Sequence, residues 1–331
     1  MPDFDRMTAA ARNALIHALD LVADDCVLVV GDDSAGSCPD AFAAAAASVG
    51  CDVDVFRLPE EGRPLQAMPE GMLAMLEGRT VVINAIAGLS DEVPFRLQWL
   101  KAVEDLDLRL GHSPGICDAM MLDGPLEVDY AEMRARARLV SAALEGAETV
   151  HIASAMGSDL SLTIAGRPIV NDVHITATEK GVNLPCGEVY ICPVETAGEG
   201  VLVVDGCFGG DGNVPTPVTI TVANGLVVDV ASDNPALTAR VNELMDTDAG
   251  SRHVCELGIG LNPGAQLVGN MLEDEKALRT LHVAFGGNQG MPGGENTSQM
   301  HMDYLIHRPT LTAVFPDGHE VVVLSNGDII I

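Results

Sequence analysis

Five of the histidines and carboxylates between residues 188 and 303 stand in contexts that suggest metal binding. His301 and Asp303 stand two positions apart, so on a strand they point to the same face. His282 stands alone in an apolar segment, and Glu188 and Glu256 each stand among apolar residues and glycines. A buried carboxylate needs a partner, which is an arginine, a backbone N–H or a bound cation. Equally, His282 is either a hydrogen-bonded core histidine or a ligand, and His301 with Asp303 is either a surface ion pair or part of a metal site.

Taken together, these two imidazoles and three carboxylates could hold two divalent ions about 3.5–4 Å apart, with one carboxylate bridging them. The ligand charges would leave a net positive charge that stabilises a bridging hydroxide. Such a hydroxide attacks an amide carbonyl at neutral pH, so we expect hydrolysis. Zn, Co and Mn all suit a set of imidazole and carboxylate ligands.

Other motifs of the sequence do not support catalysis. The segment Gly111-His112-Ser113-Pro114-Gly115 has the spacing of a nucleophile elbow, but Pro114 has no N–H to donate to an oxyanion. We interpret this segment as a turn. The sequence contains no P-loop, and the glycines from Gly258 to Gly264 lack the spacing of a dinucleotide-binding loop. We therefore expect neither a P-loop nucleotide nor a Rossmann-bound redox cofactor.

The elements that must position the candidate ligands change in kind near residue 155. Up to there, helices and strands alternate, which predicts a parallel, Rossmann-like layer. The helices are predicted at 7–23, 39–49, 68–76, 92–104 and 129–145, and the strands at 26–31, 52–58, 80–85 and 148–154. Beyond residue 158, short apolar strands are separated by Asn-Gly and Asp-Gly turns, which are typical of hairpins. We predict a Rossmann-like α/β domain over 1–155 and a β-rich, largely antiparallel, metal-binding catalytic domain over 156–331.

The composition restricts the partners and the compartment. The 331 residues include 18 Lys and Arg against 48 Asp and Glu, a formal net charge of −30, which disfavours binding to nucleic acid or to an anionic membrane surface. The eight cysteines form no Cys-x-x-Cys pair, which favours free thiols in a reducing compartment. Charges interrupt the first 25 residues, and no uncharged apolar run reaches 18 residues. We therefore expect no signal peptide, no membrane span and a cytoplasmic location.

Several segments resemble those of the thermophilic-type metallo-aminopeptidases, the group of leucyl aminopeptidases also called aminopeptidase T. These are Gly157-Ser-Asp-Leu160, Asn183-Leu-Pro-Cys-Gly-Glu-Val189, Glu256-Leu-Gly-Ile-Gly-Leu-Asn-Pro263, Asp274-Glu-Lys276, Thr280-Leu-His282, Ala284-Phe-Gly286, Asn296-x-Ser298 and His301-x-Asp303. The resemblance covers much of 155–330. It implies a homodimeric two-metal aminopeptidase that acts on short peptides. It also implies that Glu188, Glu256, His282, His301 and Asp303 are the metal ligands, and we expect either Glu188 or Glu256 to act also as a proton shuttle.

The chain departs from this family at one position and leaves two rival functions open. The family has a tyrosine shortly after the histidine of the Thr-x-His segment, whereas here Gln289 stands about where it would fall. One rival is a ring-cleaving dioxygenase of the dihydroxypyridine type, which resembles the same fold. There, His282, His301 and Asp303 would hold a single Fe(II). The other rival is a non-catalytic family member that binds metal or peptide.

The charge composition generates a prediction about salt. Only three of the 18 cationic residues are lysines, and aromatic residues make up 3% of the chain, which is typical of proteins that work in concentrated salt. Salt shortens the Debye length to about 3 Å at 1 M and screens repulsion among carboxylates. We expect the free energy of unfolding to fall as salt is lowered from about 2 M to below about 0.2 M. Urea unfolding at both salt concentrations tests this, and equal stability would identify an ordinary acidic protein instead.

Overall fold

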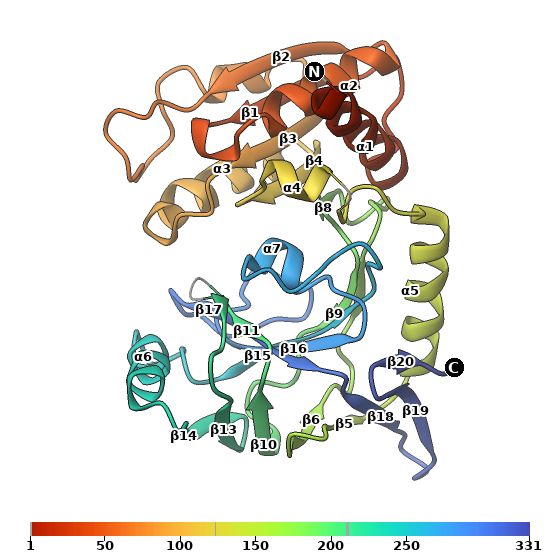
Figure 1. The fold of residues 1–331 in the computed structure, drawn as a ribbon, viewed down its shortest axis with the longest axis vertical. Coiled ribbons are helices and arrows are strands. Elements are labelled where there is room, and N and C mark those ends of the chain that lie inside the picture. The colour runs from red at the N-terminus through yellow and green to blue at the C-terminus, as the bar shows by residue number, and fades with distance from the viewer. Residues whose placement is uncertain (1, 123, 210–211) are drawn as a thin grey trace. The chain divides into compact units, whose positions relative to one another are not determined.

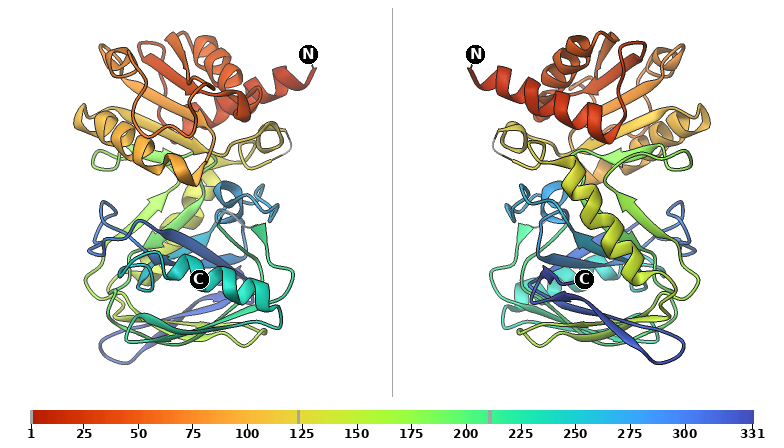
Figure 2. Two further views of the ribbon diagram at one scale, coloured as in Figure 1. Left: turned by 90° about the vertical axis from the view of Figure 1, so that its left-hand side faces the viewer. Right: turned by 90° about the vertical axis from the view of Figure 1, so that its right-hand side faces the viewer.

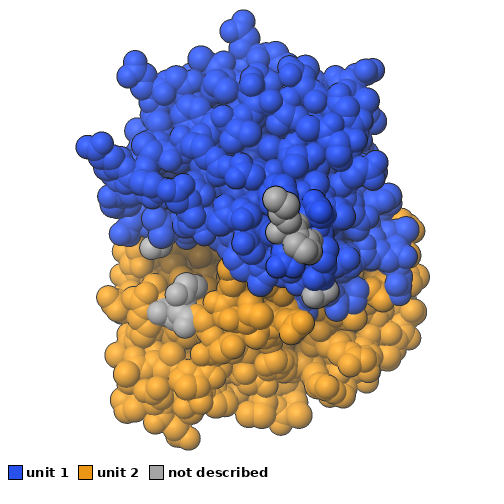
Figure 3. Space-filling view, turned by 45° about the horizontal axis from the view of Figure 1, so that its top comes forward, with its two compact units in different colours: residues 1–134, 172–186, 263–265 blue, residues 135–171, 187–262, 266–331 orange. Residues whose placement is uncertain are grey.

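A computed structural model describes residues 2–122, 124–209 and 212–331, and its contacts divide the chain into two units (Figure 3). Unit 1 comprises Met1–Arg134, Asp172–Cys186 and Pro263–Ala265, and unit 2 comprises Ala135–Asn171, Gly187–Asn262 and Gln266–Ile331. The boundary predicted at residue 155 falls inside unit 2, so the contacts divide the chain differently from the sequence pattern. The predicted domains 1–155 and 156–331 stay a prediction.

Unit 1 contains a parallel sheet of five strands in the order β2-β1-β3-β4-β8 (Figure 1). Their bounds are Cys26–Gly31 (β1), Asp52–Arg57 (β2), Val81–Ile86 (β3), Arg109–Pro114 (β4) and Gly181–Asn183 (β8). The helices of this part are Pro2–Ala18 (α1), Cys38–Val49 (α2), Val93–Asp105 (α3) and Asp118–Met121 (α4), with short 3₁₀ turns at Asp33–Ala35, Leu73–Leu76 and Ser90–Glu92. The central strands β1 and β3 are almost wholly buried, as expected of parallel strands covered on both faces.

A buried ion-pair cluster lies at the carboxyl end of this sheet. Asp32 follows β1 directly and accepts a hydrogen bond from the Ala87 N–H at 2.7 Å, just beyond β3. The guanidinium of Arg63 lies 2.8 Å from Asp32 and 2.9 Å from Glu92, and both carboxylates are buried. Burial by itself raises the pKa of Asp32, but the bonds from Ala87, Ser34 and Arg63 hold that pKa below its usual value. The cluster therefore needs an ionised Asp32.

Unit 2 is built from two β-sheets (Figure 1). The first, sheet B, has the order β14-β13-β10-β6-β5-β18-β19-β20. Its strands are Thr149–Ala153 (β5), Asp159–Thr163 (β6), Gly198–Val204 (β10), Val218–Ala223 (β13), Leu226–Ala231 (β14), Thr310–Val314 (β18), Glu320–Ser325 (β19) and Asp328–Ile329 (β20). Buried and partly exposed side chains alternate along β6 and β13, so one face of sheet B packs on the core.

The second sheet of unit 2, sheet C, has the order β12-β11-β17-β16-β15-β9-β7. Its strands are Ile169–Asp172 (β7), Glu188–Ile191 (β9), Cys207–Phe208 (β11), Gly212–Asn213 (β12), Val254–Gly260 (β15), Thr280–Gly286 (β16) and His301–His307 (β17). Helices α6 (Pro235–Met245) and α7 (Met271–Asp274) also belong to unit 2, whereas α5 (Tyr130–Leu144) begins in unit 1 and continues into unit 2. Figure 2 gives two further views of these elements.

The predicted fold class is confirmed, because a parallel α/β sheet is combined with antiparallel sheets formed by the second half of the chain. Three local predictions are wrong. Residues 68–76 form only the 3₁₀ turn Leu73–Leu76, since Pro69 and Gly71 disfavour an α-helix. The segment interpreted as a turn at Gly111–Gly115 lies mostly within β4, whose last residue is Pro114. The strand predicted over 148–154 exists as β5, but it pairs antiparallel with β6 and β18.

Among the residues that the structure describes, none of the helices combines the length and the apolar character needed to cross a bilayer.

The cluster at Asp32 generates a prediction about stability. We expect Asp32→Asn to lower the free energy of unfolding by about 3 kcal/mol at pH 7, because it removes one partner of a buried ion pair. An Asp with a lowered pKa stabilises the fold above its unfolded pKa of about 3.9, and this stabilisation is lost as the pH falls below that value. The loss of stability on acidification below about pH 4 should therefore be smaller in Asp32→Asn than in the wild type.

Urea unfolding from pH 7 down to pH 3 measures both effects. Asp105→Asn is the matched control, because Asp105 is exposed and pairs with the exposed Lys101. We expect this control to cost less than about 0.5 kcal/mol. If Asp32→Asn unfolds like Asp105→Asn, the cluster does not stabilise unit 1.

Candidate metal centre

The five predicted ligands all lie on four neighbouring strands of sheet C, within unit 2. Glu188 begins β9, Glu256 lies in β15, His282 lies in β16, and His301 and Asp303 lie in β17. These strands are adjacent in the order β17-β16-β15-β9. The structure thus brings together side chains that are up to 115 positions apart in sequence, although it does not test their assignment as ligands.

The strand register places all five side chains on the same face of sheet C. Asp303 pairs with Ala284, Ala284 pairs with Glu256, and Glu188 pairs with Gly260. Directly paired residues of antiparallel strands share a face, and so do residues two apart on one strand. His282 shares the face of Ala284, and His301 shares that of Asp303. The opposite face is apolar: Phe285 and Phe208 pack on the ring of Tyr304, with ring centroids 5.8 and 5.6 Å away.

Small residues occupy the positions between the ligands on this face. Gly258 pairs with His282, Gly260 pairs with Glu188, and Gly286 pairs with His301. A Cβ atom at Gly258 would lie 2.0 Å from Cε1 of His282 and 2.1 Å from its Nε2. The absence of a side chain at Gly258 therefore makes room for the imidazole. Gly258 and Gly260 belong to the glycine-rich segment Gly258–Gly264 that lacks the spacing of a dinucleotide-binding loop, and the sequence did not predict that they space the ligands.

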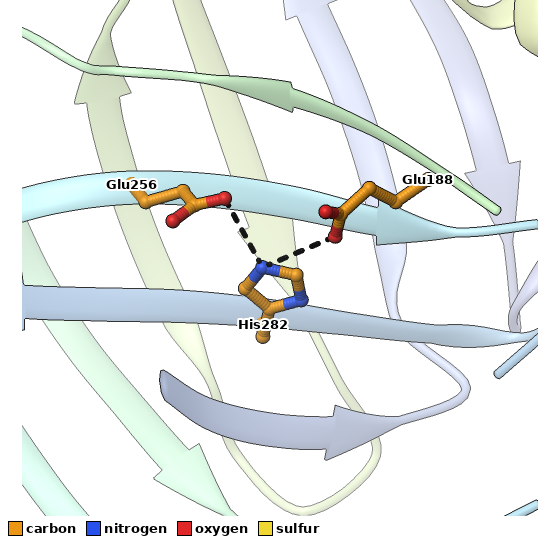
Figure 4. Close-up of side chains that lie close together, drawn as sticks. All are labelled: Glu188, Glu256 and His282. Carbon is orange, nitrogen blue, oxygen red and sulfur yellow. Dashed lines mark ion pairs between the residues drawn. The ribbon is translucent and has the colours of Figure 1, made fainter. Parts of the chain in front are cut away.

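The ligand atoms form two groups that share Glu256. In the first group, His282 Nε2 lies 3.6 Å from Glu188 Oε2 and 3.6 Å from Glu256 Oε1 (Figure 4). In the second group, His301 Nε2 lies 3.1 Å from Glu256 Oε2 and 3.6 Å from Asp303 Oδ1. Asp303 Oδ1 is also 3.8 Å from His282 Nε2. One oxygen of Glu256 thus faces each group, which is the arrangement of a bridging carboxylate.

The donor atoms fit divalent ions. Glu188 Oε2 and Asp303 Oδ1 are buried and accept no hydrogen bond from the described part of the chain, so a bound cation would satisfy them. Nδ1 of His301 lies 2.7 Å from the carbonyl oxygen of Gly287, to which it can donate a hydrogen bond. This bond would leave the lone pair of His301 on Nε2, which faces the carboxylates. Imidazole and carboxylate donors in this arrangement suit Zn, Co, Mn or Fe(II).

The electrostatics of the site couple metal binding to proton release. Burial by itself lowers the pKa of His282, but the carboxylates of Glu256, Asp303 and Glu188 raise it to about 9. Burial by itself raises the pKa of Glu256, but His282 and His301 hold it below the usual value. Without a metal, His282 therefore carries a proton at neutral pH, and an ion that binds to Nε2 must displace it.

The structure adds two polar side chains that the sequence analysis did not assign to the site, although Lys276 ends the family-like segment Asp274-Glu-Lys276. Lys276 is buried, and its ammonium is paired with the carboxylates of Glu188 and Glu275. Tyr190 pairs with Gly258 in register, so it lies on the ligand face two residues after Glu188. The signal for Lys276 was its rarity, as one of three lysines in the chain. Gln289, which stands near the position of the family's tyrosine, accepts a hydrogen bond from Thr297 at 3.0 Å in the β16–β17 loop.

Comparisons with known proteins were made for the family and for the fold. The sequence model of the family described as "Thermophilic metalloprotease (M29)" matches residues 115–329. Aminopeptidase AmpS of Bacillus subtilis (strain 168) is 24% identical over an alignment of 196 residues, which covers 53% of this chain and 47% of that protein. The chain thus spans about half the length of this curated relative.

Two solved structures share the fold over nearly the whole chain. The 2,5-dihydroxypyridine dioxygenase from Pseudomonas putida KT2440 has a TM-score of 0.73 at 20% identity, and the match covers 99% of this chain and 97% of that one. Wild-type AmpT from Thermus thermophilus has a TM-score of 0.71 at 18% identity, and the match covers 99% of both chains. At these identities the likeness shows the fold alone, and it does not choose between the two reactions.

The close approach of Gly258 to His282 generates a prediction. We expect Gly258→Ala to displace the imidazole and to weaken metal binding at least about tenfold, because ligand orientation governs affinity. Equilibrium dialysis with Co²⁺ and elemental analysis measure this. Gly181→Ala is the matched control, since its new methyl group would meet only an ordinary contact at 3.9 Å in strand β8. Equal Co²⁺ affinity in the two variants would show that His282 is not a ligand, or that the backbone of sheet C shifts to accommodate the methyl group without affecting binding.

Proposed function

Because the chain belongs to the thermophilic metalloprotease (M29) family, we propose that it is a metal-dependent aminopeptidase that removes N-terminal residues from short peptides. One observation supports this proposal above the others. Glu256 presents one carboxylate oxygen to each of two groups of ligand atoms, so the donor set suits two ions rather than one.

Each residue of the site has a distinct part in this proposal. Glu256 bridges the two positions, His282 and His301 contribute neutral nitrogen donors, and Asp303 presents Oδ1 near both imidazoles. Two divalent ions of Zn, Co or Mn, when bound there, would polarise the scissile carbonyl and activate water. Both oxygens of Glu256 face imidazoles, whereas burial raises the pKa of Glu188 above its usual value against the lowering effect of Lys276. Of the two glutamates, Glu188 is thus the better proton shuttle.

A second candidate function is supported by the pairing of Glu188. The ammonium of Lys276 is paired with Glu188, so that carboxylate is less available to bind a metal ion. The remaining His282, His301 and Asp303 form a set of two histidines and one carboxylate, with Asp303 Oδ1 3.8 and 3.6 Å from the two imidazoles. This set suits a single Fe(II) and the ring cleavage of a dihydroxylated pyridine. A non-catalytic protein that binds metal or peptide is the outcome if neither reaction is found.

The setting of the enzyme is also a proposal. We propose a cytoplasmic protein of a high-salt cell, because all eight cysteines are free and the net charge is −30. We further propose a homodimer, which is the state that the family resemblance implies.

The shared carboxylate provides the test of the proposed function. We expect chelation by EDTA to abolish the cleavage of aminoacyl p-nitroanilides, and Zn²⁺, Co²⁺ or Mn²⁺ to restore it. We expect Glu256→Gln to lower both metal content and the cleavage rate at least about 100-fold, because it removes an oxygen ligand from both positions. Glu243→Gln is the matched control, since Glu243 is an exposed residue of α6 that pairs with Arg240.

Three results would contradict the aminopeptidase proposal. Full cleavage by Glu256→Gln would remove Glu256 from the mechanism. One equivalent of iron, with O₂ uptake on a dihydroxypyridine and no peptide cleavage, would establish the dioxygenase instead. Metal binding without either reaction would identify a binding protein.

A further inference from the structure

A buried ammonium group lies within the candidate metal centre. The side chain of Lys276 is 0% exposed, and its Nζ is ion-paired with Glu188 Oε1 and lies 2.7 Å from Glu275 Oε1. Taking an ammonium out of water is costly unless carboxylates compensate it. The two glutamates provide that compensation, so Lys276 is a fixed positive charge beside Glu188.

The backbone holds Lys276 next to the strand that carries Glu256. The carbonyl of Lys276 accepts a hydrogen bond from the Asn262 N–H at 2.8 Å, and the N–H of Leu278 donates to the Asn262 carbonyl at 3.1 Å. At Gly260, the last residue of β15, a Cβ atom would lie 2.0 Å from the carbonyl oxygen of Ala277. This close packing fixes the base of the lysine side chain, so the ammonium has little freedom to leave Glu188.

The pairing makes the two groups of ligand atoms unequal. In the group of Glu188, Glu256 and His282, Lys276 occupies Oε1 of Glu188, and Oε2 accepts no hydrogen bond from the residues that the structure describes. In the group of Glu256, His301 and Asp303, none of the ion pairs described for these residues involves a lysine or an arginine. A dication entering the first group therefore meets a resident cation, and one entering the second group does not.

We propose that Lys276 makes the two metal positions differ in affinity. The position formed by Glu256, His301 and Asp303 binds a divalent ion first. The position formed by Glu188, Glu256 and His282 binds more weakly, because an ion there competes with the ammonium for Glu188. Lys276 is thus a positioning residue that acts through Glu188. This proposal rests on the proposed function only in requiring that the site binds divalent ions.

Titration of the metal-free chain with Co²⁺, followed by equilibrium dialysis and by visible absorption, tests the ranking. We expect the wild type to bind one equivalent tightly and a second at least about tenfold more weakly. In Lys276→Met we expect the second dissociation constant to fall at least about tenfold and the first to change less than about threefold. We expect Lys276→Arg to keep the wild-type order, because it retains the charge.

Lys101→Met is the matched control, because it makes the same change of net charge at an exposed residue of α3. We expect its two binding steps to match those of the wild type. Circular dichroism shows whether Lys276→Met folds. If it does not fold, Glu275→Gln tests the proposal instead. Removing the charge of Glu275 leaves the ammonium to Glu188 alone, so the second step should weaken at least about threefold and by more than the first, since Glu275 also interacts with Asp303.

The results separate this inference from the function on which it rests. Two equally tight steps in the wild type would overturn the ranking and leave the aminopeptidase proposal standing. A second step that does not respond to Lys276→Met, or to Glu275→Gln where Lys276→Met does not fold, would also overturn the ranking alone. A wild-type chain that binds no Co²⁺ would overturn both proposals.

Discussion

Unit 2 depends on the compensation of negative charge on one face of sheet C. Glu188, Glu256 and Asp303 are all buried there, and uncompensated carboxylates in such a place would oppose folding. The imidazoles of His282 and His301 and the ammonium of Lys276 face these carboxylates, which raise the pKa of His282 so that it holds a proton at neutral pH when no metal is bound. Divalent cations are the natural replacement for the protons. The same buried negative charges that lower the stability of the fold are therefore the source of the metal affinity that we propose.

The geometry of the sheet allows this concentration of charge. The period of two along β15 and β16 puts apolar side chains on one face, where they pack as a core, and ligands with glycines and alanine on the other. Gly258 shows the reason for the small residues, since any side chain there would occupy the space of the His282 ring. The ligand face thus depends on the glycines, which leave room for the ligand side chains, as well as on the ligands themselves.

Unit 1 solves a related problem in a different way. At the carboxyl end of its parallel sheet, Asp32 and Glu92 are compensated by Arg63 and by backbone N–H groups, and the cluster is internally satisfied. In the metal centre, by contrast, Glu188 Oε2 and Asp303 Oδ1 accept no hydrogen bond. This difference separates an acidic cluster with a structural function from one that is open to a ligand.

The sequence by itself determined the change from alternating helices and strands to hairpin-forming strands, and it singled out Glu188, Glu256, His282, His301 and Asp303, because period and residue type are local properties. It did not determine that β8, which lies beyond the predicted domain boundary, completes the parallel sheet, or that β5 joins an antiparallel one, since strand partners are chosen by packing at long range. Only the tertiary structure decided that Glu256 faces two groups and that Lys276 holds Glu188. Residues 188 and 276 are far apart in the chain, and only the pairing of β9, β15 and β16 and the contact of Lys276 with the end of β15 bring them together.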